Sequence, residues 1–213
     1  MNASELLFLL DGLKWTIALS AIGFVFGAIG GLGVALARTS GLHPLERCMA
    51  GYIALFQGTP LLMQLFMVYY GLALIGLKLD AWQAVAIGFT LHASAFLGEI
   101  WRGSIQAIPR GQTEAAKALS LGYVARMRLV ILPQALRISL PATIGFLVQL
   151  TKGTSLAAIV GFTELARAGT MVSNQIFKPL LVFGVVGALY FTICWPLSLY
   201  GTWLERRLAV AAR

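Results

Sequence analysis

The chain has 213 residues, of which 59% are hydrophobic and 11% are charged, and its net charge is +8. Soluble domains carry about 25% charged residues, so this composition excludes an ordinary soluble protein and predicts one that lives in lipid. The positive charge does not indicate a nucleic-acid partner, because the basic residues gather in loops between apolar stretches instead of forming one solvated stripe.

Five apolar stretches have roughly the 20 residues that a helix needs to cross the hydrocarbon layer. The sequence therefore predicts an all-α, polytopic membrane protein with a single transmembrane domain over residues 1–213. The expected spans are residues 15–37, 49–75, 81–101, 138–162 and 180–203. Residues 1–10 lack the basic start and the cleavage site of a signal peptide, so we expect the first span to be retained.

The distribution of Lys and Arg sets the expected orientation, because cytosolic loops are enriched in both. Most of the 16 basic residues fall on one side of the membrane if the N-terminus is outside and the C-terminus inside. This arrangement places a long polar loop, residues 102–134, in the cytosol. The loop has several basic residues and a single acid, Glu114.

The first span contains Gly23, Gly27 and Gly31 at i, i+4 spacing. In lipid, such a row of small residues allows two helices to approach closely. Packing within the chain is the simpler interpretation, and an interface with a second subunit is the alternative.

Polar side chains inside the expected spans are candidates for a solute pathway, because lipid disfavours them unless they have a role. The second span is also expected to kink at Pro60. The candidates are Gln57, Thr59 and Gln64 in the second span, His92 in the third, and Gln149, Lys152, Thr154 and Ser155 in the fourth. Lys152 has two interpretations: its ammonium holds a substrate carboxylate, or its side chain snorkels to the outer interface. For His92, a packing role is the alternative.

The cytosolic loop is expected to contain two short helices. The first lies within residues 104–119, is interrupted near Pro109, and is capped by Gln112 or Thr113. A turn follows at residues 120–122. A second helix over residues 123–130 is expected to end at Pro133, where the chain returns to the membrane.

Several kinds of chemistry lack their motifs in this sequence. It contains no phosphate-binding Gly-rich loop and no nucleophile and base at a recognisable spacing. With two histidines and two cysteines, Cys48 and Cys194, we expect no metal site and no disulfide. We therefore expect a protein that is not an enzyme and that binds no cofactor itself.

The tripeptide Glu114-Ala115-Ala116, followed by Ser120 and by Val130-Ile131-Leu132-Pro133, resembles the Glu-Ala-Ala loop of ABC importer permeases. Residues 58–62, 99–109 and 152–156 resemble segments of the polar amino-acid permeases of that family. Ser120 replaces the glycine of the family pattern, so we expect Gly122 to supply the flexible point of the turn.

The resemblance implies a permease subunit of an ATP-driven ABC importer that moves a polar amino acid or a close analogue across the bacterial cytoplasmic (inner) membrane. It implies that the loop docks on a partner ATPase dimer, which binds the ATP and Mg. Further implied partners are an identical or sister permease, an extracytoplasmic solute-binding protein and membrane lipid. The implied coupling residues are Glu114, Ala115, Ala116, Ser120, Gly122 and Pro133. Gly153 occupies a position where relatives often have an acid or amide, which argues against a pocket for a cationic side chain.

Two other kinds of protein remain as alternatives: a self-sufficient, ion-coupled secondary transporter or channel, and a membrane-anchored scaffold. For Glu114, the alternative to coupling is a solvated acid paired with Lys117 at i+3. Glu99 and Arg102 are expected to pair with each other or to brace the loop, which is a structural role. Residues 163–178 are expected to form an outer loop, helical in part, that meets the solute-binding protein.

Overall fold

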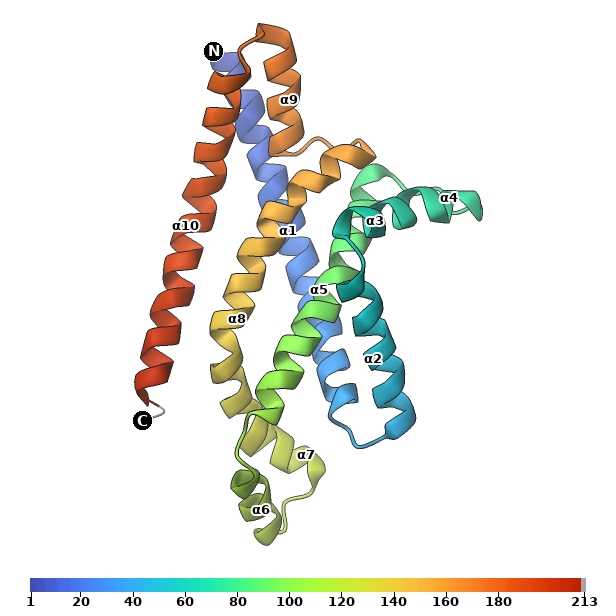
Figure 1. Cartoon of the computed structure of the whole chain (residues 1–213), viewed down its shortest axis with the longest axis vertical. Coiled ribbons are helices and arrows are strands. Elements are labelled where there is room, and N and C mark those ends of the chain that lie inside the picture. The colour runs from blue at the N-terminus through green and yellow to red at the C-terminus, as the bar shows by residue number, and fades with distance from the viewer. Residues whose placement is uncertain (212–213) are drawn as a thin grey trace.

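The computed structural model describes residues 1–211, which are helical with no strand. The long helices α1, α5, α8 and α10 extend along the length of the molecule, with the N-terminus and α9 at one end and α6 and α7 at the other (Figure 1). The elements are α1 (Ala3–Arg38), α2 (His43–Gly58), α3 (Leu61–Phe66), the π-helical turn η1 (Met67–Gly71), α4 (Leu72–Leu74), α5 (Ala81–Gln106), α6 (Arg110–Ala118), α7 (Tyr123–Arg126), the π-helical turn η2 (Met127–Ile131), α8 (Leu132–Gly153), the 3-10 helix η3 (Thr154–Val160), α9 (Leu165–Ile176) and α10 (Pro179–Ala211).

Four helical segments among the described residues are long and apolar enough to cross a membrane. They are Ala3–Arg38, Ala81–Gln106, Tyr123–Val160 and Pro179–Leu208. The pair His43–Gly58 and Leu61–Leu74 makes a fifth if it is counted as one span, but its two halves are bent by 106°. The all-α prediction is therefore confirmed, and the predicted five spans are reached when this bent pair is counted as the second span, with its break at the expected Pro60.

The first and third spans form the closest helix pair in the molecule. Gly23 lies against Phe89, and Gly27 lies against Ala93. A Cβ atom at Gly23 would come within 2.7 Å of the Cβ of Phe89, so a larger residue would force the helices apart. The glycine row, which continues to Gly31, thus serves packing within the chain, as its simpler interpretation predicted.

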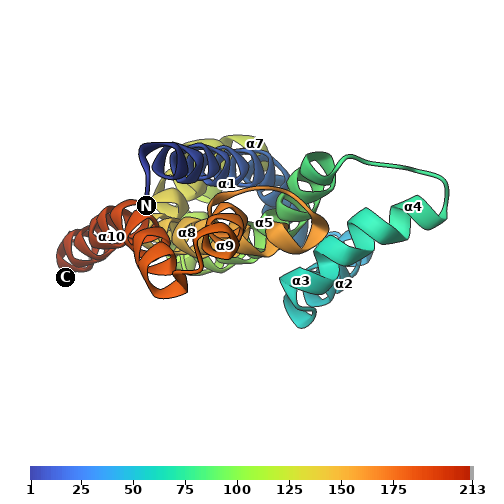
Figure 2. The ribbon, with the colours of Figure 1, turned by 90° about the horizontal axis from the view of Figure 1, so that it is seen from above.

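The break in the second span is held by side-chain hydrogen bonds. Pro60 has an extended backbone and lacks an N–H group, so carbonyl groups at the end of α2 lose their helical partners. The Gln64 Nε2 group donates to the carbonyl oxygens of Phe56 (2.7 Å) and Thr59 (3.0 Å). Seen from above, α4 extends away from the long helices (Figure 2), whereas Leu65 of α3 is buried against α5.

A buried carboxylate joins three helices at the end opposite to α6. Glu164 has no exposed surface and caps α9, where it accepts from the backbone N–H groups of Ala166 and Arg167 at 2.9 and 2.8 Å. Its Oε2 atom also accepts from the hydroxyl of Tyr190 on α10 (2.8 Å) and from that of Thr16 on α1 (3.4 Å). The helical part of the predicted outer segment is therefore tied to both the first and the last span.

Candidate functional site

Helix α6 ends in a tight turn formed by the residue that replaces the family glycine. Ser120 has a left-handed backbone with φ +57°. Its N–H donates to the carbonyl of Lys117 (2.8 Å), and the N–H of Leu121 donates to that of Ala116 (3.0 Å). These two bonds form a Schellman cap, which glycine normally makes. Gly122 has an ordinary extended backbone with φ −62°, so the expectation that it supplies the flexible point is wrong.

The start of α6 also differs from the prediction. The N-cap is Pro109, and the helix begins at Arg110 without a side-chain cap. Neither Gln112 nor Thr113 caps it, because the fixed φ of proline lets the chain enter the helix directly after Pro109. The Oε1 atom of Gln112 instead accepts a 3.3 Å hydrogen bond from Gln134, which links α6 to the start of α8.

The Glu-Ala-Ala tripeptide presents two of its side chains to the outside. Glu114 and Ala115 are exposed, whereas Ala116 is only 2% exposed. Among the described residues, Glu114 forms no ion pair, and the predicted alternative partner Lys117 does not reach it. The carboxylate of Glu114 is therefore available to a group outside this chain.

The loop passes into the fourth span without leaving the helical conformation. Tyr123–Val160 is one continuous helical segment, with a π-helical turn directly before α8. Pro133 lies inside this helical segment, just after the π-helical turn, where proline removes one helical hydrogen bond. The expectation that Pro133 ends a separate short helix is therefore wrong, and the fourth span begins well before residue 138.

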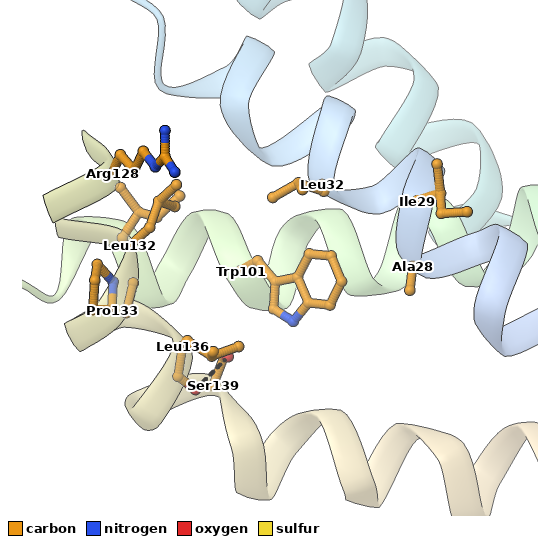
Figure 3. A pocket seen from close by; sticks show the side chains of 11 residues that line it. Ala28, Ile29, Leu32, Trp101, Arg128, Leu132, Pro133, Leu136 and Ser139 are labelled. Carbon is orange, nitrogen blue, oxygen red and sulfur yellow. Dashed lines mark hydrogen bonds between the residues drawn. The ribbon is translucent and has the colours of Figure 1, made fainter. Parts of the chain in front are cut away.

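An apolar hollow of about 620 Å³ lies where the loop meets the spans. Leu32 of α1, Trp101 of α5 and Leu132 of α8 lie around it, with Pro133 and Arg128 at the loop side (Figure 3). Trp101 donates from Nε1 to Thr143 on α8 at 3.0 Å, so its ring joins two spans. Few polar groups reach this hollow, which makes it a poor site for a polar solute.

The polar residues predicted for the solute pathway fall into separate groups. Gln64 and His92 are each 7% exposed, and their Oε1 and Nδ1 atoms lie 2.9 Å apart. Thr59 donates to the carbonyl of Leu55 and also accepts from Gln64. The side chains of Thr59, Gln64 and His92 are thus linked by hydrogen bonds at the break in the second span. Gln57, by contrast, is exposed on α2.

The fourth-span candidates lie on two faces of their helix. Lys152 is exposed and lines a hollow of about 370 Å³ between α8 and α10. The neighbouring Gly153 faces the opposite way, since a Cβ atom there would lie 3.2 Å from Leu61. Thr154 is fully buried and donates to the carbonyl of Thr151. The remaining two candidates are Gln149, which is exposed, and Ser155, which donates to the carbonyl of Lys152.

Other pairings agree with the sequence. Arg102 binds Glu99 through two nitrogen atoms, and this predicted ion pair lies at the loop end of α5. Cys48 and Cys194 are both free. Sequence reasoning missed Glu164 and the face of α10 that borders Lys152. The face of α10 could have been found from the sequence, because its residues recur at the spacing of one helix face. They are residues 187, 190, 191, 194, 195 and 198.

The broken second span, the continuous fourth span and the capped loop helix together define a polytopic membrane protein with a structured loop between its spans. Residues 23–210 match the family described as binding-protein-dependent transport system inner membrane component. The chain belongs to this family, and it is a multi-pass permease component of the cytoplasmic (inner) membrane.

Individual relatives cover nearly the whole chain. It is 37% identical over 198 residues to the L-cystine transport system permease protein TcyB of Bacillus subtilis (strain 168), covering 92% of this chain and 85% of that protein. It is 34% identical over 202 residues to the probable amino-acid ABC transporter permease protein YckA of the same organism, covering 95% and 89%. A crystal structure of an amino acid ABC transporter with histidines has a TM-score of 0.86 and 31% identity, covering 94% of each chain.

Proposed function

We propose that this chain is the transmembrane subunit through which an ATP-driven importer moves a polar amino acid or a close analogue into the cell. The family supports the import direction, since its description names transport systems that depend on a binding protein. The relatives support the substrate class, because they are named as permease proteins for L-cystine and for amino acids.

The observation that carries this proposal is the exposed face of α6. Glu114 and Ala115 point outward from a short helix whose far end is fixed by the cap at Ser120. Alanine allows close approach of a flat partner surface, and an unpaired carboxylate offers a charge-assisted hydrogen bond. A partner ATPase dimer that binds ATP and Mg would press on this face, and Ala116 would pass the force to the body of the molecule.

The proposal includes further partners. An identical or sister permease completes the membrane portion, and an extracytoplasmic solute-binding protein delivers the amino acid near α9. Lipid surrounds the spans. Within this chain the pathway role is assigned to Lys152, which lines a hollow, and to the exposed residues Gln57 and Gln149. Thr59, Gln64 and His92 are assigned to holding the bend because their polar atoms are already paired.

Glu114→Lys tests the coupling role. In proteoliposomes that contain the permease, its ATPase and its binding protein, we expect this change to reduce ATP-driven amino-acid uptake at least 100-fold while membrane insertion is unchanged. Asp11→Lys is the matched control, because it makes the same charge change at an exposed site at the other end of the molecule. If Glu114→Lys supports uptake at the wild-type rate, Glu114 has no role in coupling the ATPase to transport. Uptake without ATP that follows an ion gradient would favour a secondary transporter instead.

A further inference from the structure

The hollow between α8 and α10, called here the α8–α10 hollow, combines one cation with an aromatic wall. Its volume of about 370 Å³ lies within the range of pockets that hold small ligands. Lys152 contributes the cation from α8. The wall is one face of α10 and consists of Gly187, Tyr190, Phe191, Cys194, Trp195 and Ser198.

We propose that this hollow binds the transported amino acid, holds its α-carboxylate on Lys152, and selects side chains that are uncharged and partly apolar. The proposal rests on the permease function proposed above and names the substrate class of that permease. It assigns α10 a role in the solute pathway, through Phe191, Trp195 and Ser198.

The ammonium group of Lys152 is available for a ligand. It has no hydrogen bond or ion pair with any residue in the range 1–211. A lysine near an apolar wall gains most from a compact anion, because water competes less for the charge there. The carboxylate that every amino acid carries fits this requirement.

The aromatic wall is partly fixed before any ligand arrives. Phe191 and Trp195 stack with ring centroids 5.5 Å apart and planes 15° from parallel, and both rings are more than half exposed. Tyr190 is held through its hydroxyl by the buried carboxylate of Glu164 at 2.8 Å. A wall that keeps its shape loses little side-chain freedom when an apolar side chain packs on it.

The charges of the hollow oppose a charged side chain of either sign. No acid lines it, so the guanidinium of an arginine ligand would meet Lys152 without a counter-charge. A second carboxylate would find no second cation. The hydroxyl of Ser198 donates to the carbonyl of Cys194 and keeps its lone pairs. These lone pairs and the ring faces can receive the α-ammonium of the ligand.

Ligand pairs of matched shape test this selectivity. Equilibrium binding to the permease–ATPase complex in lipid nanodiscs, without the solute-binding protein, compares L-citrulline with L-arginine and L-glutamine with L-glutamate. We expect the uncharged member of each pair to bind at least tenfold more tightly. Equal or tighter binding of the charged members, or no binding of any of the four, would overturn the proposal.

Three variants locate the site. Lys152→Met keeps an unbranched side chain one atom shorter and removes the charge, and it should weaken L-glutamine binding at least tenfold. Trp195→Leu should weaken it severalfold, whereas Trp203→Leu, the same change on α10 outside the hollow, should not. Wild-type affinity in both Lys152→Met and Trp195→Leu would overturn this site. If wild-type proteoliposomes still show ATP-driven uptake in that case, the permease function stands and only the site is rejected.

Discussion

The buried carboxylate of Glu164 shows how one residue can fix the outer end of a membrane protein. A charge inside a protein is costly unless hydrogen bonds satisfy it. Here two backbone N–H groups and two hydroxyls point at the carboxylate, and they come from α1, α9 and α10. The residue was not singled out in the sequence, because its value depends on Thr16 and Tyr190, which are distant along the chain.

Glu164→Gln should therefore destabilise the protein. The amide presents an NH₂ group where the carboxylate oxygens accept hydrogen bonds, so at least one buried donor loses its partner. We expect a loss of about 2 kcal/mol in the free energy of unfolding, visible as a lower thermal unfolding temperature in detergent. Glu205→Gln, at an exposed position on α10, serves as the control. Equal unfolding temperatures of the two variants would contradict the conclusion that Glu164 holds α1, α9 and α10 together.

At the scale of elements, two interruptions of helical structure each depend on individual residues. The cap of α6 uses a serine in the left-handed region, which L-residues other than glycine adopt at a cost. The second span is broken at Pro60 and held by Gln64.

Ser120→Gly should stabilise the loop, because glycine adopts a positive φ without steric cost. We expect a gain of about 1 kcal/mol, measured as slower hydrogen exchange at the amide of Leu121, which donates to Ala116. Gly122→Ala should leave this exchange rate nearly unchanged, since the φ of Gly122 suits any residue. Faster exchange in Ser120→Gly would contradict the cap geometry.

Gln64→Leu should loosen the bend between α2 and α3. The change leaves the carbonyl groups of Phe56 and Thr59 without their donor and deprives His92 of its partner. We expect a loss of about 2 kcal/mol in stability and a broader distribution of distances between spin labels placed on α2 and α4. Gln57→Leu, at an exposed position on α2, is the matched control and should keep the wild-type distribution.

At the scale of the whole molecule, the N-terminus and the loop helix α6 lie at opposite ends (Figure 1). In a Cys48→Ser background, Asn2→Cys should react with a membrane-impermeant maleimide added outside intact cells, because we predict that the N-terminus is outside. Thr113→Cys should react only after the cells are opened. Labelling of Thr113→Cys in intact cells would place α6 outside and would refute docking on a cytosolic ATPase.

Much of the architecture could be predicted from the sequence, because apolar length and glycine spacing act locally. The spans, the close packing of the glycine face of α1 and the Glu99–Arg102 pair follow from residues a few positions apart, whereas the choice of α5 as the partner of α1 does not. Tertiary partners determine the rest. The sequence did not reveal that Gln64 and His92 bind each other, because they are 28 residues apart. The role of Ser120 likewise depends on a backbone angle that no spacing reveals.

The unbroken segment from Tyr123 to Val160 makes α8 a lever arm. Lys152 lies 29 residues beyond Tyr123, a distance of roughly 44 Å at 1.5 Å per residue, so a tilt of about 10° with the lower end fixed would carry its backbone roughly 8 Å sideways. A small rotation at the cytosolic end would thus become a displacement as large as a whole amino acid near the far end of the helix. A small movement of the partner ATPase against the loop would in this way open or close the α8–α10 hollow.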